Sequence, residues 1–292
     1  MSTIALLGAV ELGLVYAFVG IGVYLSFRVL SFPDLTVDGS FPLGAAVAAV
    51  LIVSGINPWA ATGVAMVAGA AAGLVTAFLN VRFAILHLLA SILTMIALFS
   101  INLRVMGKPN VAIIANETML TPFYGLGLSE FTVKPLFLAV LVIVALAVVG
   151  RFLLSEAGLA MRATGANARM AEAQGVDTRL QIYLGLALSN ALVALGGALF
   201  AQTNGFADVT SGIGTIVVGL AAVIVGETVL RTRLVVIALV GCVLGSVVYR
   251  LAIQFALSAD VLGLKASDLN LVTAVLVTIA LVLPRLRGGR PA

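Results

Sequence analysis

Long apolar runs separated by short polar stretches dominate the chain. A helix needs about 20 mainly apolar residues to cross the hydrocarbon core of a bilayer, and most of the runs reach that length. They lack the alternation of membrane β-barrel strands, whose segments are only about 10 residues long. The pattern predicts an all-α integral membrane protein, a polytopic bundle of about nine transmembrane helices. The predicted segments cover residues 4–29, 40–55, 59–80, 83–103, 135–154, 181–201, 210–230, 234–255 and 268–284.

Composition excludes a soluble protein. The 292 residues are 62% apolar and only 10% charged, whereas about a quarter of the residues of a soluble domain are charged. Glycine and alanine occur throughout the apolar runs, and small residues let helices approach one another closely in lipid. We therefore expect a single transmembrane domain over residues 1–292, packed as a compact bundle.

The basic residues predict the orientation of the chain rather than a nucleic-acid partner. Lysine and arginine collect in the cytoplasmic loops of membrane proteins, and here they are spread over several loops. Eleven of them lie at one set of alternating segment ends and five at the other. This asymmetry predicts that the loop 155–180 and the C-terminus are cytoplasmic and, with nine crossings, that the N-terminus is external.

The loop 155–180 contains two short helical patterns, at about residues 156–164 and 168–174. Gly165-Ala166-Asn167 separates them; Asn167 suits an N-cap, and Gly175 suits the position after a helix end. An amphipathic hairpin at the membrane face would suit docking of a soluble partner. A basic loop that only fixes the topology is the alternative interpretation.

Three stretches carry a family resemblance. The loop reads GLAMRATGANARMAEAQGV over Gly158–Val176, the N-terminal part reads GLVYAFVGIGVYLSFRVLSFPDLTVDGSFPLGAAVAA over Gly13–Ala49, and GLAAVIVGE follows at Gly219–Glu227. In order and spacing they resemble the permease subunits of bacterial ABC importers of the branched-chain amino acid and ribose type. The segment SFPDLTVDGSFPLGAA most resembles the corresponding segment in permeases of tryptophan and tyrosine uptake systems. It differs from the commoner D-L-S-V-G motif by the additional residue Asp38.

The resemblance implies one half of a pathway for a small polar solute, an amino acid or related compound, in the bacterial inner membrane. The implied partners are a second permease copy in a homodimer, a cytoplasmic ABC ATPase dimer, and a periplasmic or lipid-anchored solute-binding protein. ATP and magnesium would bind to the ATPase and no cofactor to this chain, which lacks the phosphate-binding motif G-x-x-x-x-G-K-[ST]. The implied ATPase contact involves Glu156, Gly158, Met161, Arg162, Gly165, Asn167, Met170 and Gly175.

A polar interruption around residues 33–42 is the first candidate for the substrate pathway. Pro33 and Pro42 disfavour a continuous helix there. If the break lies within the membrane, its carboxylates must face protein or a water-filled path, as in transporters built from discontinuous helices. If it lies at the surface, Asp34 and Asp38 only cap a helix.

A similar Asp-x-Thr sequence recurs at Asp208–Thr210 before the apolar run 210–230. An inverted repeat would place the two copies on opposite faces of the membrane, and chance similarity is the alternative. Asn102 and Asn190, which are polar residues inside apolar segments, either contact substrate or join helices. The candidate pathway residues are Asp34, Thr36, Asp38, Gly39, Asn190, Asp208 and Thr210.

No catalytic set or metal site emerges from the sequence. His87 is the only histidine and Cys242 the only cysteine, whereas zinc needs three or four ligands. The chain is therefore expected to be neither an enzyme nor a metal-binding protein. A transporter driven by an ion gradient is the alternative function. It would need ionisable residues deep in the bundle, and only Asp34, Asp38 and His87 are candidates.

Overall fold

The computed structural model describes residues 3–126, 130–230, 232, 234–258, 275 and 278. Seven helices in this part of the chain are long and apolar enough to cross a membrane, which confirms the predicted helical membrane fold. An eighth apolar helix is shorter. The ninth predicted segment, residues 268–284, lies outside the described residues except at 275 and 278, as does the C-terminus.

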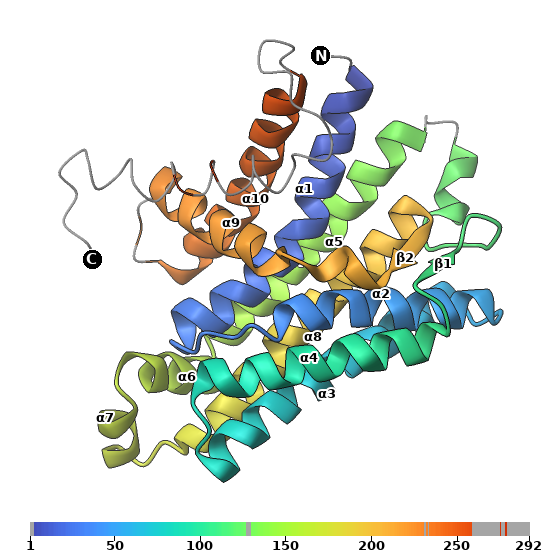
Figure 1. Cartoon of the computed structure of the whole chain (residues 1–292). Helices are drawn as coiled ribbons and strands as arrows, with labels where there is room; N and C mark the ends of the chain where they lie inside the picture. Colours follow the sequence, from blue (N-terminus) through green and yellow to red (C-terminus); the bar gives the residue numbers. More distant parts are fainter. Residues whose placement is uncertain are drawn as a thin grey trace.

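The elements follow one another with few long connections (Figure 1). The helices are α1 (Thr3–Val23), η1 (Tyr24–Val29, which continues α1), α2 (Val37–Val53), α3 (Pro58–Phe83), α4 (His87–Met106), η2 (Thr121–Leu126), α5 (Glu130–Leu153), α6 (Glu156–Ala166), α7 (Ala168–Ala173), α8 (Thr178–Asn204), η3 (Val209–Gly212), α9 (Thr215–Val229) and α10 (Val235–Ser258). Two strands, β1 (Asn110–Ala112) and β2 (Phe206–Asp208), pair antiparallel. The sequence did not predict them, because three residues are too few to show a periodicity.

Local sequence signals set several helix boundaries. The side chain of Asn57 caps α3 by accepting a hydrogen bond from the backbone N–H two residues later, at 2.9 Å. Asp177 caps α8 in the same way. Gly107 and Gly205 follow the ends of α4 and α8 with φ of +67° and +80°, a conformation that glycine adopts without steric cost.

Helix α8 lies at the centre of the bundle, and small residues let other helices approach it. A Cβ on Gly44 of α2 would overlap the carbonyl oxygen of Ala194, and one on Gly73 of α3 would overlap that of Leu186. On α8 itself, Gly197 lies against the Phe41 backbone in the same manner. Close backbone contact of this kind is the main source of helix association in lipid, and it confirms the predicted compact packing.

The expectation that Pro42 interrupts the chain is wrong, because α2 begins at Val37 and contains Pro42. A proline inside a helix removes one backbone hydrogen bond, the bond to the carbonyl four residues earlier. That carbonyl belongs to Asp38, and a Cβ on Gly212 would overlap it. The break is confined to residues 30–36, between η1 and α2.

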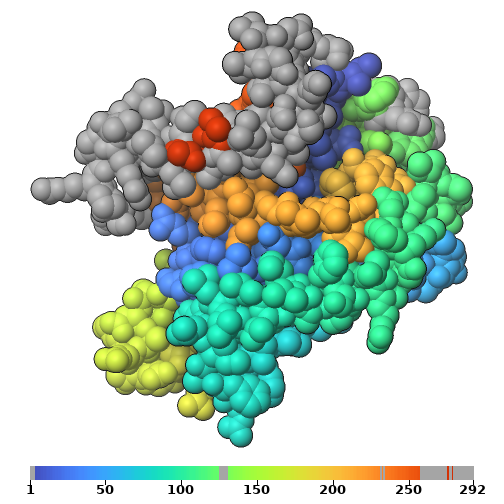
Figure 2. Space-filling model, in the orientation of Figure 1, coloured from blue at the N-terminus to red at the C-terminus, as the bar shows by residue number. Residues whose placement is uncertain are grey.

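The hairpin of α6 and α7 lies at one end of the bundle, whereas β1 and β2 lie at the other (Figure 1). Figure 2 shows α6 and α7 as a knob that projects beyond the helices, with α4 exposed on the face in view. The two predicted loop helices are thus confirmed, except that α6 continues through Gly165 to Ala166.

Candidate functional sites

The break between η1 and α2 lies in the protein interior. Asp34 and Thr36 are both 0% exposed, so their side chains face protein. The Asp34 carboxylate turns back on its own backbone, because Oδ1 accepts a hydrogen bond from the N–H of Thr36 at 2.9 Å.

Five buried polar residues around this break form what we call the Asp34 cluster. Asp34 Oδ2 accepts a hydrogen bond from Asn190 Nδ2 at 2.7 Å. Asn190 Oδ1 accepts one from the Ser40 hydroxyl, also at 2.7 Å. The hydroxyls of Thr36 and Thr76 lie 2.7 Å apart. The cluster joins the break, α2, α3 and α8, and each partner satisfies a group that would otherwise be costly to bury.

Asp38 connects the first turns of two helices that are far apart in sequence. Its carboxylate lies in the first turn of α2 and accepts hydrogen bonds from the backbone N–H of Ile216, at 2.7 Å, and of Gly214, at 3.3 Å. These donors belong to the start of α9, where free N–H groups and the helix dipole favour a negative charge. Both helices therefore begin inside the protein and meet at one carboxylate.

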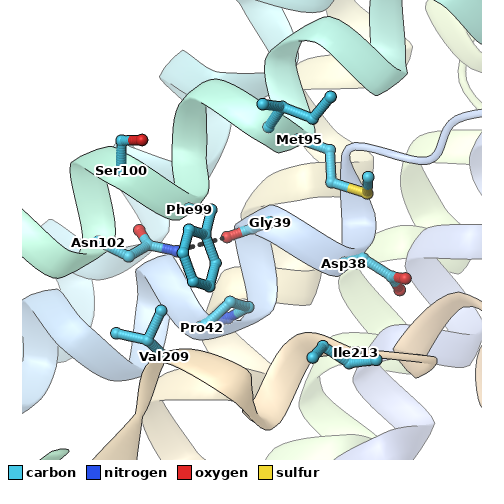
Figure 3. Close-up of a pocket in the computed structure, with 10 residues that line it drawn as sticks. Asp38, Gly39, Pro42, Met95, Phe99, Ser100, Asn102, Val209 and Ile213 are labelled. Atoms are coloured by element: carbon cyan, nitrogen blue, oxygen red, sulfur yellow. Dashed lines mark hydrogen bonds between the residues drawn. The ribbon is translucent and has the colours of Figure 1, made fainter. Parts of the chain in front are cut away.

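A cavity of about 410 Å³ lies beside this junction, between α2, α4 and η3 (Figure 3). Its walls are mainly apolar, and its polar side chains are those of Asp38, Ser100 and Asn102. Asn102 Nδ2 donates to the carbonyl oxygen of Gly39 at 3.2 Å, whereas Asn102 Oδ1 has no hydrogen-bond partner among the described residues. The lining residues are Asp38, Gly39, Pro42, Met95, Ile96, Phe99, Ser100, Asn102, Val209 and Ile213.

The second Asp-x-Thr sequence forms the same local turn as the first. Asp208 Oδ1 accepts hydrogen bonds from the N–H of Thr210, at 2.7 Å, and from its hydroxyl. Asp208 nevertheless lies at the strand end of the bundle, where Asn110 of β1 also donates to it. Partial burial raises the pKa of Asp208, whereas the hydrogen bonds from Thr210 and Asn110 lower it by a larger amount. The net pKa of Asp208 therefore lies below its usual range.

The predicted pathway residues therefore separate into three places. Asp34, Thr36 and Asn190 meet in the closed cluster, Asp38 and Gly39 line the cavity, and Asp208 and Thr210 form a turn at the strand end. The sequence analysis named Asn102 as a residue that contacts substrate or joins helices, but it did not list Asn102 among the pathway candidates, because the only signal was an amide in an apolar segment.

The α6–α7 hairpin has one face against the bundle and one face outward. Gly158 and Met161 are buried, and a Cβ on Gly165 would overlap the backbone carbonyl of Val29. Asn167 caps α7 by accepting from the N–H of Met170 at 3.1 Å, as predicted. Gly175 follows that helix with φ of +83°. The outward residues are Glu156, Asn167, Met170 and Gly175, with Arg162 half-buried.

Comparisons with known proteins identify the family. The profile described as "Branched-chain amino acid transport system / permease component" matches residues 5–283. This chain belongs to that family. The permease is 35% identical over 265 residues to a protein of Clostridioides difficile (strain R20291) named "Tyrosine transport system permease protein", covering 90% of this chain and 86% of that protein. It is also 34% identical over 192 residues to "Uncharacterized protein RP368" of Rickettsia prowazekii (strain Madrid E), covering 66% of each.

A solved structure shares the permease's fold. It is described as "PsaBC from Streptococcus pneumoniae in complex with Fab", and the TM-score is 0.54 at 16% identity, covering 94% of this chain and 89% of that one. As a member of a permease family, the chain is a transport component and not an enzyme.

The single histidine, His87, packs on the ring of Phe32, with ring centroids 4.3 Å apart. Within the described residues, no three His, Cys, Asp or Glu side chains are grouped to hold a metal ion.

Proposed function

We propose that this permease is the membrane subunit of an importer driven by separate ABC ATPase subunits, and that the α6–α7 hairpin receives their force. The single observation that carries this proposal is the two-faced hairpin. Leu159 and Met170 are more than half exposed on its outer face, next to charged residues such as Arg169 and Glu172. An apolar patch with a charged rim is the usual composition of a protein–protein interface.

The inner face of the hairpin connects such a contact to the rest of the permease. A Cβ on Gly158 would overlap the Phe152–Leu153 backbone at the end of α5, and one on Gly165 would overlap the Val29–Leu30 backbone at the end of η1. Packed protein of this density is not continuously deformable. A push on the hairpin would therefore move α5 and the α1–η1 helix instead of being absorbed locally.

The charge distribution supports a cytoplasmic position for this end of the bundle. Arg28, Arg82 and Arg151 lie at the helix ends nearest the hairpin, and the hairpin adds Arg162 and Arg169. The positive-inside rule assigns such an end to the cytoplasm. The strand end would then face outward, toward a periplasmic or lipid-anchored binding protein.

A second copy of the chain would complete the pathway. Helix α4 exposes large apolar side chains on the face that carries the cavity, among them Ile96 and Phe99 at 59% and 50%. A homodimer that joins these faces would enclose the cavities between two chains and shield them from lipid. The name of the Clostridioides relative supports an amino acid, of the tyrosine type, as the substrate.

The test is transport by the purified permease with its ATPase and its binding protein in proteoliposomes. We expect tyrosine uptake that requires ATP, and loss of ATPase association when residues 165–175 are deleted or when Arg162 is changed to Glu. The matched control is Arg82→Glu, at the same end of the bundle but on α3. Uptake by the permease alone, driven by a proton or sodium gradient, would instead establish the ion-driven alternative.

A further inference from the structure

A second cavity, of about 520 Å³, lies where the α6–α7 hairpin meets the membrane helices. It is bounded by the end of the α1–η1 helix, by α6, and by Val235 at the start of α10. Helix α6 packs beside that end of the α1–η1 helix (Figure 1). Polar and apolar groups form its wall in similar proportion, whereas the wall of the cavity beside Asp38 is mainly apolar.

Two arginines from different parts of the chain line this cavity. Arg28 comes from η1 and Arg162 from α6. The side chain of Arg28 is 52% exposed and Arg162 is half-buried, so neither is sealed in the protein interior. Among the described residues, no aspartate or glutamate lines the cavity. The charged groups of its wall are therefore all positive.

Much of the hydrogen-bonding capacity of these arginines is unused. Arg28 donates through Nε and Nη2 to the carboxylate of Glu227, which uses two of the five donors of a guanidinium group. Arg162 has neither a hydrogen bond nor an ion pair within the part of the chain that the structure describes. Glu227 thus balances one guanidinium, and one positive charge at the cavity is left without a counterion.

The backbone at the cavity wall has an uncommon conformation. Ser31, which lines the cavity, has φ of +54°, a region that few residues other than glycine adopt and that is found mainly at functional sites. The preceding segment, η1, is a π-helix, and π-helical turns also occur frequently at functional sites. Both features favour a binding site over ordinary packing at this position.

The wall is suited to a phosphate group that is attached to an apolar body. Guanidinium groups bind phosphate oxygens with two parallel hydrogen bonds. Val29, Leu159 and Val235 supply apolar wall beside the arginines, and Leu234 and Val236 next to it are 63% and 42% exposed. Basic pockets between helices on the cytoplasmic side of a membrane bind anionic lipid head groups.

We infer that this cavity binds the phosphate group of an anionic ligand between Arg28 of η1 and Arg162 of the hairpin. The apolar part of the wall favours an anionic phospholipid over free phosphate as its source. The site goes beyond the proposed function, and only the assignment of the lipid to the cytoplasmic leaflet rests on it. A bound phosphate joins the hairpin to η1 through two charged contacts, in addition to the close packing at Gly165.

A lipid series tests this on the unmodified chain. The purified, delipidated permease without its ATPase is titrated with dioleoyl phosphatidylglycerol or dioleoyl phosphatidylcholine, and bound lipid is measured by native mass spectrometry. The choline group cancels the charge of the phosphate, so phosphatidylglycerol should bind at least about fivefold more tightly, the value of one hydrogen bond.

Inorganic phosphate distinguishes the two sources of the ligand. If phosphatidylglycerol binds and millimolar phosphate does not displace it, the site is a lipid site. If phosphate displaces the lipid, the cavity recognises the phosphate group by itself. If phosphate binds and the permease does not prefer phosphatidylglycerol, the ligand is free phosphate.

Three variants assign the site to the cavity. Arg162→Gln should weaken phosphatidylglycerol binding at least about fivefold. Glu227→Gln removes the carboxylate that competes for Arg28, so it should strengthen binding. Arg151→Gln is the matched control, because Arg151 is exposed at the same end of the bundle, in the last turn of α5, and does not line the cavity. Its binding should equal that of the unmodified permease.

Several results would overturn the assignment. They are equal binding of the two lipids together with no binding of phosphate, an unchanged preference in folded Arg162→Gln protein, and an equal loss in Arg151→Gln. If Arg162→Gln does not fold, the lipid series and Glu227→Gln decide. Because binding is measured without the ATPase, a failure of the site leaves the proposed function standing, and absence of ATP-driven uptake rejects that function without affecting the site.

Discussion

The carboxylate of Asp38, in α2, accepts a 2.7 Å hydrogen bond from the backbone N–H of Ile216, in α9. The two residues are 178 positions apart in the sequence, and their helices both begin inside the bundle. Each helix start has N–H groups without an intrahelical partner. One carboxylate therefore satisfies the start of α9 while it belongs to the first turn of α2, and it joins the two helices beside the cavity.

Removing this junction should destabilise the protein. Asp38→Ala leaves the buried N–H groups of α9 without their acceptor, at a cost of about 1–3 kcal/mol. Asp38→Asn keeps an amide oxygen for Ile216 and should lose less. Thermal unfolding of the purified permease checks the order, with Asp177→Ala, a cap at the exposed start of α8, as the comparison. Equal midpoints for Asp38→Ala and the unmodified protein would contradict the role of the junction.

The hairpin should lose its close packing against the end of η1 when Gly165 is replaced by a larger residue. In Gly165→Val the new side chain must overlap the Val29 carbonyl, and forced overpacking costs about 1–3 kcal/mol. We expect a displaced hairpin and reduced ATPase retention on co-purification. Gly63→Val on α3 is the control, because a Cβ there meets nothing within 4 Å. Full retention of the ATPase by Gly165→Val would show that the close contact between the hairpin and η1 is not needed for ATPase binding.

The Asp34 cluster should be a structural unit. Asn190→Ala removes both the amide group that donates to Asp34 and the amide oxygen that accepts from the Ser40 hydroxyl. Leaving buried polar groups without their hydrogen-bond partners costs about 1–3 kcal/mol, so a fall in the unfolding midpoint is expected. Ser54→Ala, which loses only an exposed bond within its own helix, should leave the midpoint unchanged. If Asn190→Ala instead has a normal unfolding midpoint and an altered substrate preference, the Asp34 cluster is part of the substrate pathway.

The ion pair between Arg28 and Glu227 should matter more for coupling than for stability. It joins η1 to α9, and Arg28 shares a cavity of about 520 Å³ with Arg162 of the hairpin. The two side chains are 52% and 32% exposed, and exposed pairs contribute about 0–1 kcal/mol. Arg28→Glu should therefore fold normally but lower ATP-driven uptake, and Arg28→Glu combined with Glu227→Arg should restore it. If the single and double variants both fold but the double variant does not regain ATP-driven uptake, the effect depends on Arg28 alone and not on its pairing with Glu227.

The local features of this permease were readable from sequence. Eight of the predicted segments and both hairpin helices appear in the described residues, because apolar length, Asn167 as a cap and Gly175 as a terminator act within a few residues of themselves. The Asp-x-Thr turns at Asp34 and Asp208 are local in the same sense, which explains why both form.

Only the tertiary structure decided which residues are inside. In lipid, a helix can be apolar on every side, so hydropathy does not mark its inner face. Helices α4 and α8 have nearly equal mean hydropathies of 1.9 and 1.8, yet 28% and 72% of their spans are buried. The Asp34 cluster, the Asp38–Ile216 junction and the hydrogen bond from Asn102 to Gly39 all depend on pairings between distant helices. Those pairings follow from close packing at small residues such as Gly44 and Gly73, which the sequence contains but does not match to their partners.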